Sequence, residues 1–415
     1  MKVLIIGGYI SKEKRGGAGI AVWEICKAIS KTEDVYWLPL TSMSDFTTLF
    51  RKSITQSGVK VIYKNFPPSV LINMVMEFFS RGLKSISRYA NKLSRRIYYA
   101  SLYAYGKAYC EYIISVLKPD IVHIHGFNIL SYPFFSAAIN QGVPTIGTAH
   151  GLNSLNRNII KDYDKAMESD LMRKVINSGG AITLVSTKDN TDIIKEFNIP
   201  STSTHVVLNG VDFNRFGQKN MSKMELRKKY GIPLNRKIFL HVAALNKRKN
   251  HMEVLKALNN MDKTFRDELL YLVVGGGSQM DILHEYVYEN GLSSNVIFKG
   301  SLYGNTLVDF YHLSDLFILS STSEGFPLVF LEAMASGLPI VTFKDLEGVA
   351  DISNPIDCLE LIQERSTTSI INAMRIATEK NWDREKIKET AKKYSWDCIG
   401  KQYITIYDMV IKNFA

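Results

Sequence analysis

Short runs rich in β-branched residues recur along the whole chain and alternate with segments of helix length. In the first half these runs lie at residues 3–6, 59–63, 121–124, 145–148, 182–185 and 205–208. In the second half they lie at 237–242, 269–274, 296–298, 316–319 and 340–343. Helical patterns lie between them, for example at 18–29, 250–259 and 280–290. This alternation is typical of parallel βαβ units, so the sequence predicts an α/β fold with two Rossmann-like sheets.

The two series of strands are separated by the segment NGVDFN at 209–214, which carries turn chemistry. We place a hinge there and expect a first domain at 1–212 and a second at 213–395. The last stretch, 396–415, has a helical pattern of its own. We expect it to be a helix that crosses back to the first domain. In doubly wound sheets, ligands bind outside the carboxyl ends of the strands, which directs attention to the residues that follow each strand.

Composition excludes several classes of protein. Among 415 residues, 46% are hydrophobic and 22% are charged, which is unlike a disordered chain, a collagen or a disulfide scaffold. The four cysteines form no CxxC pair, and the apolar start of the chain is too short for a signal peptide. With no membrane-spanning run in the sequence, we expect a protein on the cytoplasmic side. The net charge of +11 favours acidic partners.

The segment that follows the run at 316–319 contains two glutamates eight residues apart, Glu324 and Glu332. Pro327 suits the first turn of a helix, whose leading backbone N–H groups at Leu328 and Val329 would then attract a diphosphate. Glu332 would lie one turn further in, within reach of a neutral diol, while Glu324 would remain in the loop and face the substrate. The alternative is a pair of surface glutamates that flank an ordinary helix.

The segment SEGFPLVFLEAMASGLPIV at 323–341 resembles the signature of the retaining glycosyltransferases of family 4, which have the GT-B fold. Five further segments resemble parts of that family in the same order: GGAG at 16–19, DIVHIHG at 120–126, TAHG at 148–151, LNGVD at 208–212 and LSDLFILSS at 313–321. The resemblance covers most of the chain. It implies a hexosyl transfer from a nucleoside-diphosphate sugar, by default a UDP-sugar, with retention at the transferred carbon.

The resemblance also implies roles for individual residues. Glu332 would bind the ribose hydroxyls, and Glu324 would contact hydroxyls of the donor sugar. His150 would contact the donor sugar or the transferring centre; the alternative is a structural histidine. The backbone near the donor would come from Gly16, Gly17, Gly325, Phe326, Leu328 and Val329. For Gly16 and Gly17 we expect that close approach and φ freedom require glycine; the alternative is a flexible surface turn.

Cations after the first strand of the second domain stabilise the leaving diphosphate in the family. Lys249 matches the family lysine, but Ala244 stands where the arginine is common. Arg248 or Lys247 would supply the second charge instead, unless this run is merely a solvated surface. We expect no cofactor and no metal, because His123 and His125 lack a third ligand at suitable spacing and no Asp-x-Asp motif follows a strand.

A basic segment lies at 81–97. No acidic residue lies between Glu77 and Glu111, and the segment would form a helix with a basic face. One interpretation is docking on an anionic membrane, which suits a lipid-linked or glycan acceptor; the other is a core-packed helix with a solvated basic rim. The basic residues of this region are Arg81, Lys84, Arg88, Lys92, Arg95, Arg96 and Lys107.

The sequence leaves other functions open. It resembles enzymes of bacterial surface polysaccharide synthesis, which would act at the inner face of the membrane. A different GT-B nucleotide-sugar enzyme, such as an epimerase or a hydrolase, is an alternative. A catalytically weak nucleotide-sugar-binding module is a second alternative, because the arginine is missing. We expect no nucleic-acid partner, because no recognition motif is present.

Overall fold

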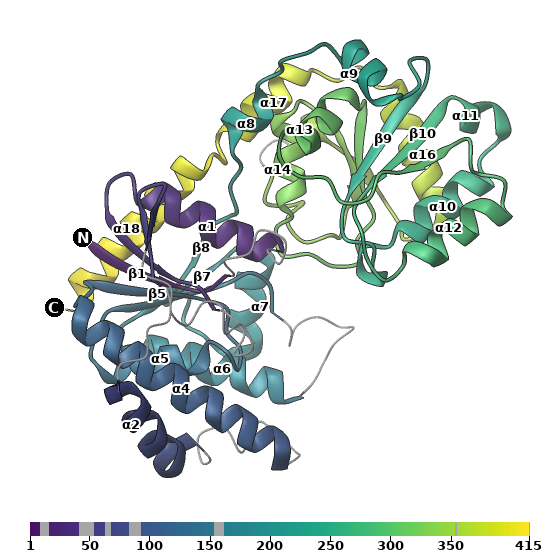
Figure 1. The fold of residues 1–415 in the computed structure, drawn as a ribbon. Coiled ribbons are helices and arrows are strands. Elements are labelled where there is room, and N and C mark those ends of the chain that lie inside the picture. The colour runs from purple at the N-terminus through teal and green to yellow at the C-terminus, as the bar shows by residue number, and fades with distance from the viewer. Residues whose placement is uncertain are drawn as a thin grey trace. The chain divides into compact units, whose positions relative to one another are not determined.

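The computed structural model describes residues 1–8, 16–40, 54–62, 68–82, 93–152, 162–352 and 355–414. The chain divides into two compact units. The first comprises residues 1–209 together with 396–415, and the second comprises 210–395. The boundary falls in the NGVDFN turn segment, and the C-terminal helix belongs to the first unit, which therefore contains both ends of the chain (Figure 1).

The first unit is built on an eight-stranded sheet with the order β3-β4-β2-β1-β5-β6-β7-β8. The paired strands are parallel except for β3, which forms an antiparallel hairpin with β4 through Ser57 and Gly58, both at positive φ. The order reverses between β1 and β5. The strands are β1 Lys2–Ile6, β2 Asp34–Leu38, β3 Ile54–Gln56, β4 Val59–Val61, β5 Ile121–His125, β6 Thr145–Ala149, β7 Ala181–Leu184 and β8 Thr204–Val206.

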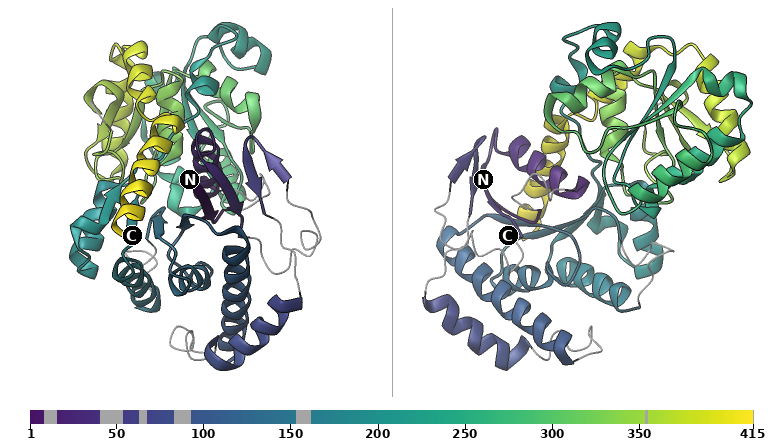
Figure 2. Two further views of the ribbon diagram at one scale, coloured as in Figure 1. Left: turned by 90° about the vertical axis from the view of Figure 1, so that its left-hand side faces the viewer. Right: turned by 45° about the vertical axis from the view of Figure 1, so that its right-hand side comes forward.

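Helices cover both faces of this sheet (Figure 1). Helices α1 and α18 lie on one face and α4, α5 and α6 on the other, while α2 packs outside α4 (Figure 2). Helices α1 and α18 approach closely, since a Cβ atom at Gly400 would lie 2.9 Å from that of Ala28. The helices are α1 Gly17–Ile29, α2 Pro68–Glu77, the π-helical turn Phe78–Gly82, α4 Leu93–Leu117, α5 Tyr132–Asn140, α6 Asp162–Asn177, α7 Thr187–Phe197 and α18 Trp396–Phe414.

The second unit contains a six-stranded parallel sheet with the order β11-β10-β9-β12-β13-β14. Its order reverses between β9 and β12, and at such a point the loops after two neighbouring strands diverge and leave room for a ligand. The strands are β9 Lys237–Val242, β10 Leu269–Val274, β11 Val296–Phe298, β12 Leu316–Leu319, β13 Ile340–Phe343 and β14 Leu359–Ile362.

Helices α10 and α12 lie on one side of the second sheet, and α13 and α14 lie on the other (Figure 1). The helices of this unit are α8 Phe213–Gly217, α9 Lys223–Tyr230, α10 His251–Asn260, α11 Lys263–Asp267, α12 Met280–Glu289, α13 Gly304–Leu313, α14 Leu328–Ala335, α15 Pro355–Cys358, α16 Thr367–Glu379 and α17 Arg384–Lys392.

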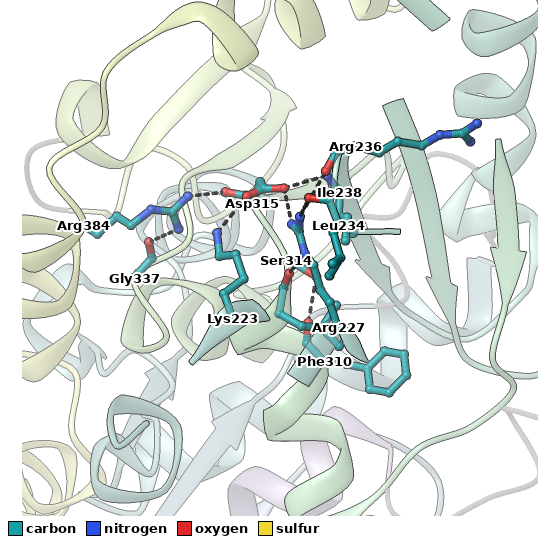
Figure 3. A network of polar contacts seen from close by, with 11 residues as sticks. Lys223, Arg227, Leu234, Arg236, Ile238, Phe310, Ser314, Asp315, Gly337 and Arg384 are labelled. Carbon is teal, nitrogen blue, oxygen red and sulfur yellow. Dashed lines mark hydrogen bonds and ion pairs between the residues drawn. The ribbon is translucent and has the colours of Figure 1, made fainter. Parts of the chain in front are cut away.

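Asp315 ties several elements of the second unit together at the start of β12 (Figure 3). Its carboxylate pairs with Lys223 and Arg227 of α9 and accepts the backbone N–H of Ile238 at 2.8 Å. Arg384 of α17 donates to the Asp315 carbonyl at 2.9 Å and to that of Gly337 at 3.1 Å. The partly buried carboxylate and the carbonyl of Asp315 thus join two helices to the sheet.

The predicted fold class is confirmed: both units are α/β, each with a sheet covered by helices that is wholly parallel in the second unit and parallel except for β3 in the first. The runs of the two series form strands at or within two residues of the predicted bounds. The sequence analysis missed β2, β3 and β14. β2 begins with Asp34 and is only partly buried, and β3 is exposed, so neither shows the continuous apolar run of a central strand.

The basic segment at 81–97 lies only partly within the described residues, because 83–92 fall outside them. Lys84, Arg88 and Lys92 are in that gap. Lys107 does not extend a basic face, contrary to its inclusion in the basic region: it is buried in α4 and pairs with Glu77 at 3.0 Å and Glu111 at 2.9 Å. Among the described helices, none combines the length and apolar character needed to span a bilayer.

Candidate active site

Two loops meet where the second sheet reverses its order. The loop after β9 ends in a short 3₁₀ turn, Lys247–Lys249, capped by the Asn246 side chain, which accepts the Lys249 N–H at 3.1 Å. The loop after β12 is joined to it: Thr322 N–H donates to the Arg248 carbonyl at 2.8 Å. The Ser320 hydroxyl donates to the Asn250 carbonyl at 2.9 Å. These bonds hold the cationic loop and the loop of Glu324 side by side.

Glu324 forms an ion cluster with both cations of the neighbouring loop. One carboxylate oxygen pairs with Lys249 Nζ, and the other with an Arg248 guanidinium nitrogen at 2.8 Å. The Glu324 side chain is 8% exposed, Lys249 14% and Arg248 41%. Glu324 lies in the loop before α14, as predicted, and its carboxylate is held there by the two cations. Of the two candidates Arg248 and Lys247, Arg248 is the cation that the structure pairs with the glutamate.

The two cations keep Glu324 ionised. Burial by itself would raise the pKa of this carboxyl, but Lys249 and Arg248 lower the pKa below its usual value overall. One carboxylate between two cations leaves these three side chains with one net positive charge. This arrangement can attract an anion such as a diphosphate.

Further contacts fix the loop that carries Glu324. The backbone N–H of Glu324 donates to the Glu347 carboxylate at 3.0 Å. Arg365 binds Asp345 with two hydrogen bonds of 3.0 Å and donates to the Ser321 carbonyl at 3.1 Å. Arg365 stands outside every motif recognised in the sequence, so no pattern predicted its role in this loop.

Helix α14 begins one residue later than predicted, because Pro327 occupies the N-cap position and Leu328 is the first helical residue. The N–H groups of Leu328 and Val329 lead the helix, where no carbonyl of the same helix can accept from them. Phe326 is buried, and a Cβ atom on Gly348 would lie 2.8 Å from its ring, at a φ of +86° that favours glycine. Packing thus places Gly325, Phe326 and the helix start.

Glu332 lies one turn into α14 and is only partly exposed. Its carboxylate accepts a hydrogen bond of 2.7 Å from the Tyr311 hydroxyl of α13. Burial raises the pKa of Glu332, although the Tyr311 bond and the charge of Arg215 act against that shift. Since Glu324 is also buried, the two carboxylates are not a pair of exposed surface glutamates. No motif or spacing in the sequence pointed to Tyr311.

In the first unit, the glycine loop opens α1. Gly16 is the N-cap and Gly17 the first helical residue. The backbone of Gly16, with φ −68° and ψ 178°, is open to any residue, and no atom lies within 4 Å of a Cβ built there. The expectation that φ freedom requires glycine at this position is therefore wrong for Gly16. The geometry still allows the other expected reason for glycine at position 16, which is that a ligand approaches the backbone closely.

His150 directly follows β6, as expected, and contacts His125 of β5. His125 Nδ1 lies 2.9 Å from His150 Nε2. Burial is the first cause of a lowered pKa for both rings, to about 4 for His150, so both are neutral at pH 7. Within the described part of the chain, no three His, Cys, Asp or Glu side chains are grouped as a metal site.

Each unit of the chain matches a family of glycosyltransferases. Residues 15–215 match the family Glycosyltransferase Family 4, and residues 222–394 match Glycosyl transferases group 1. The N-acetyl-alpha-D-glucosaminyl L-malate synthase of Bacillus anthracis is 25% identical over 305 residues, 71% of this chain and 76% of that protein. The UDP-Gal:alpha-D-GlcNAc-diphosphoundecaprenol alpha-1,3-galactosyltransferase of Escherichia coli is 27% identical over 268 residues, 63% of this chain and 67% of that protein.

Solved structures agree on the fold. Sucrose-phosphate synthase from Thermosynechococcus elongatus superposes with a TM-score of 0.76 at 15% identity, over 99% of this chain and 100% of that chain. Anabaena HepE, solved in complex with UDP, superposes with a TM-score of 0.71 at 18% identity, over 99% and 100%. The two family matches, the relatives and the paired parallel sheets together show that this chain is a GT-B glycosyltransferase and belongs to glycosyltransferase family 4.

Proposed function

We propose that the protein transfers a sugar from a nucleoside-diphosphate sugar, UDP-linked by default, to a lipid-linked or polysaccharide acceptor, with retention at the transferred carbon. The observation that carries this proposal is the Glu324–Lys249–Arg248 cluster at the point where the second sheet reverses its order. The UDP complex of the structurally similar HepE supports the nucleotide, and the E. coli relative supports a diphospholipid acceptor. A role in bacterial surface polysaccharide synthesis follows from the same likeness.

The site suggests how each group acts on such a donor. Lys249, Arg248 and the leading amides of α14 would hold the diphosphate, and Glu332 would accept from the ribose hydroxyls. As the bond between the sugar carbon and the diphosphate oxygen breaks, the acceptor oxygen bonds to that carbon from the same face. The acceptor proton passes to the departing diphosphate. The cations stabilise the charge that develops on the leaving group, which is commonly the largest catalytic contribution. In this proposal no metal and no cofactor takes part.

Binding of the diphosphate would have to release the cations from Glu324 at least in part. Glu324 could then accept hydrogen bonds from hydroxyls of the donor sugar, the role that the family resemblance implies. The cluster would thus exchange one anion for another without leaving Lys249 unpaired. A buried unpaired charge is costly, so this exchange would avoid that cost both before and after the donor binds.

A donor screen tests the proposal. Purified protein is incubated with UDP-, GDP- and ADP-sugars and lipid extract, and nucleoside diphosphate release is measured for the wild type, Glu324→Ala and Lys249→Ala. Lys256→Ala, which removes an exposed lysine of α10, is the matched control. Release from one donor that is lost in both variants but kept in the control supports the proposal. NMR of the product must then show a retained anomeric configuration.

Other outcomes of the screen would contradict transfer. Free sugar released at the same rate with and without acceptor indicates a hydrolase, and an isomerised donor indicates an epimerase. Donor binding without any turnover indicates a binding module. If no nucleotide sugar is bound or turned over, the proposed function is wrong.

We further propose that the first unit docks on an anionic membrane. The basic segment 81–97 supplies the charge, and α2 with the turn after it exposes a row of apolar side chains that supports the same interpretation. Exposed residues of this row are Leu71, Ile72, Val75, Met76 and Phe79, with Phe79 76% exposed. Exposed apolar rows of this kind often mark interaction surfaces.

Vesicle sedimentation tests the docking. The wild type should sediment with vesicles that contain phosphatidylglycerol, and replacement of Ile72, Met76 and Phe79 by Ser should reduce the bound fraction. The matched control replaces two exposed apolar side chains of the second unit, Met224→Ser and Ile376→Ser. Equal sedimentation of all three proteins, or none of the wild type, would contradict the docking.

A further inference from the structure

Three histidines form a continuous buried row in the first unit. His123 and His125 project from the same side of β5, with ring centroids 4.1 Å apart. His125 in turn stacks on His150 at 5.1 Å and shares the 2.9 Å contact between their nitrogens. Among the described residues, no other side chain hydrogen-bonds to or stacks on the His150 ring, so this ring depends on His125 for its orientation.

The far end of the row is fixed by the C-terminal helix. His123 Nδ1 lies 2.7 Å from the hydroxyl of Tyr407 in α18, and its Nε2 lies 2.6 Å from the hydroxyl of Thr148 in β6. His123, Thr148 and Tyr407 are fully buried. Both nitrogens of His123 are thus occupied, and its ring presents a fixed surface on which His125 packs.

Hydrogen-bond counting shows what the outer pair can offer. A neutral imidazole has one N–H and one lone pair. The contact between His125 and His150 uses one N–H and one lone pair, so the two outer nitrogens together carry one N–H and one lone pair. These nitrogens, His125 Nε2 and His150 Nδ1, are buried and have no hydrogen-bond partner among the described residues. A hydroxyl group, which both donates and accepts, can bond to either outer nitrogen in either tautomer, whereas an ionised phosphate can only accept.

We propose that His125 is a positioning residue for the transfer: it orients His150 and, through their shared hydrogen bond, ties the tautomer of His150 to its own, so that His150 Nδ1 meets a hydroxyl of a sugar substrate. Tyr407 and His123 act one step further back by holding His125 in place. The inference rests on the proposed function for the identity of the substrate, whereas the contact between the rings does not. Neutral, buried rings suit this role, because burial lowers the pKa of all three histidines.

The test begins with the free protein. The side-chain nitrogens of the eight histidines are labelled with ¹⁵N, and the His150 signals are assigned by their loss in His150→Gln. His125→Leu should change the ¹⁵N shifts of His150 to those of a mixture of tautomers. His125→Asn, whose amide can stand near the position of Nδ1, should keep the wild-type shifts. Tyr407→Phe should shift His123 strongly and His150 less.

A matched control separates this effect from the loss of any buried tyrosine hydroxyl. Tyr271 makes the same kind of bond in the second unit, with its hydroxyl 2.7 Å from His241 Nδ1. Tyr271→Phe should leave the His150 signals unchanged. If His125→Leu does not fold, the His150 signals of Tyr407→Phe, which should shift, are compared with those of His125→Asn, which should not. Unchanged His150 signals in every folded variant overturn the inference.

Kinetics complete the test. In His125→Leu, kcat should fall by about 10- to 100-fold, with the KM for the donor unchanged within about twofold and partial rescue in His125→Asn. Changed NMR signals with an unchanged kcat overturn the positioning role. If the wild type turns over no donor, the proposed function fails, while the ¹⁵N shifts still decide whether His125 sets the tautomer of His150.

Discussion

At the scale of single residues, the Glu324 carboxylate neutralises part of the positive charge that would bind the diphosphate. A carboxylate held by Lys249 and Arg248 competes with the ligand, yet it also prevents the buried Lys249 from standing unpaired before the ligand arrives. The two cations are not equivalent, since the Arg248 side chain is far more exposed than that of Lys249. Screening by water weakens the contribution of an exposed charge, so Lys249 should contribute more.

Lys249→Ala and Arg248→Ala should therefore differ in their kinetic effect. We expect kcat/KM to fall by about 10²- to 10³-fold in Lys249→Ala, the usual range for loss of a group that stabilises transition-state charge. In Arg248→Ala, kcat/KM should fall by about 10-fold. Steady-state nucleoside diphosphate release measures both, and Lys256→Ala should remain within about twofold of the wild type. A larger loss in Arg248→Ala than in Lys249→Ala would contradict this ranking.

Glu332 should matter for nucleotide binding more than for the chemical step. Glu332→Ala removes a charged acceptor for the ribose hydroxyls, worth about 1.5–3 kcal/mol or roughly 10- to 150-fold in affinity. Tyr311→Phe removes only the bond that orients this carboxylate, so its effect should be under about 10-fold. Calorimetric titration with UDP measures both. Equal UDP affinity in Glu332→Ala and the wild type would show that the carboxylate does not bind the ribose.

The sequence could identify the residues of this site but not their pairing. Glu324, Lys249 and Glu332 were found from spacing and family resemblance, which report chemical type and position after a strand. That Glu324 binds both cations depends on how two loops about 75 residues apart meet, as the bonds between Thr322 and Arg248 show. Tyr311, Arg365 and His125 act through such contacts across loops and strands.

At the scale of elements, apolar runs predicted central strands well because those strands are buried on both faces. β14 was missed because only its two end residues are buried and Glu360 interrupts its apolar run. Lys107 shows the opposite error. Its charge suggested a surface position, whereas α2 brings Glu77 to it within the packing of α4.

The Asp315 junction should be important for the stability of the second unit. Asp315→Asn leaves Arg227 and Lys223 without their carboxylate, and removal of one member of a buried pair commonly costs about 3–5 kcal/mol. Asp262→Asn is the matched control, because asparagine can still cap α11 and only the exposed pair with Arg375 is lost. Urea unfolding at pH 7 measures both. A loss at Asp315 no larger than at Asp262 would contradict a structural role.

The same junction gives a pH dependence with a definite sign. Burial would raise the pKa of Asp315, but Lys223, the Ile238 N–H and Arg227 lower it overall. A depressed carboxyl pKa adds stability that is present above the pKa of the unfolded chain, about 4, and is lost as the pH falls through the folded value. The stability difference between the wild type and Asp315→Asn should therefore be full at pH 7 and shrink below about pH 4. A difference that stays constant down to pH 3 would contradict this linkage.

At the scale of the whole molecule, buried histidines should make the protein lose stability already at pH values above those at which its carboxyl groups are protonated. Burial is the first cause of a lowered pKa for seven of the eight. A base that is neutral when folded takes up a proton on unfolding once the pH is below about 6.5. Stability should thus decline as the pH falls from 7, by up to about 1.4 kcal/mol per pH unit for each such residue. Both units contain these histidines, so both should weaken.

His251→Phe isolates one of these contributions. Both ring nitrogens of His251 are buried without a hydrogen-bond partner among the described residues, and the ring stacks on His241 at 3.9 Å. Phenylalanine keeps the stack, removes two unsatisfied polar atoms and cannot be protonated. Because no polar atom is left unsatisfied, the variant should melt at or above the wild-type temperature at pH 8. Because burial lowers the pKa of His251 to about 3, only the unfolded wild type takes up a proton at pH 5.5, so the advantage of the variant should grow there. Calorimetry of the transition of the second unit measures both. An advantage that is equal at both pH values, or a deficit that deepens in acid, would show that His251 does not resist protonation in the folded protein.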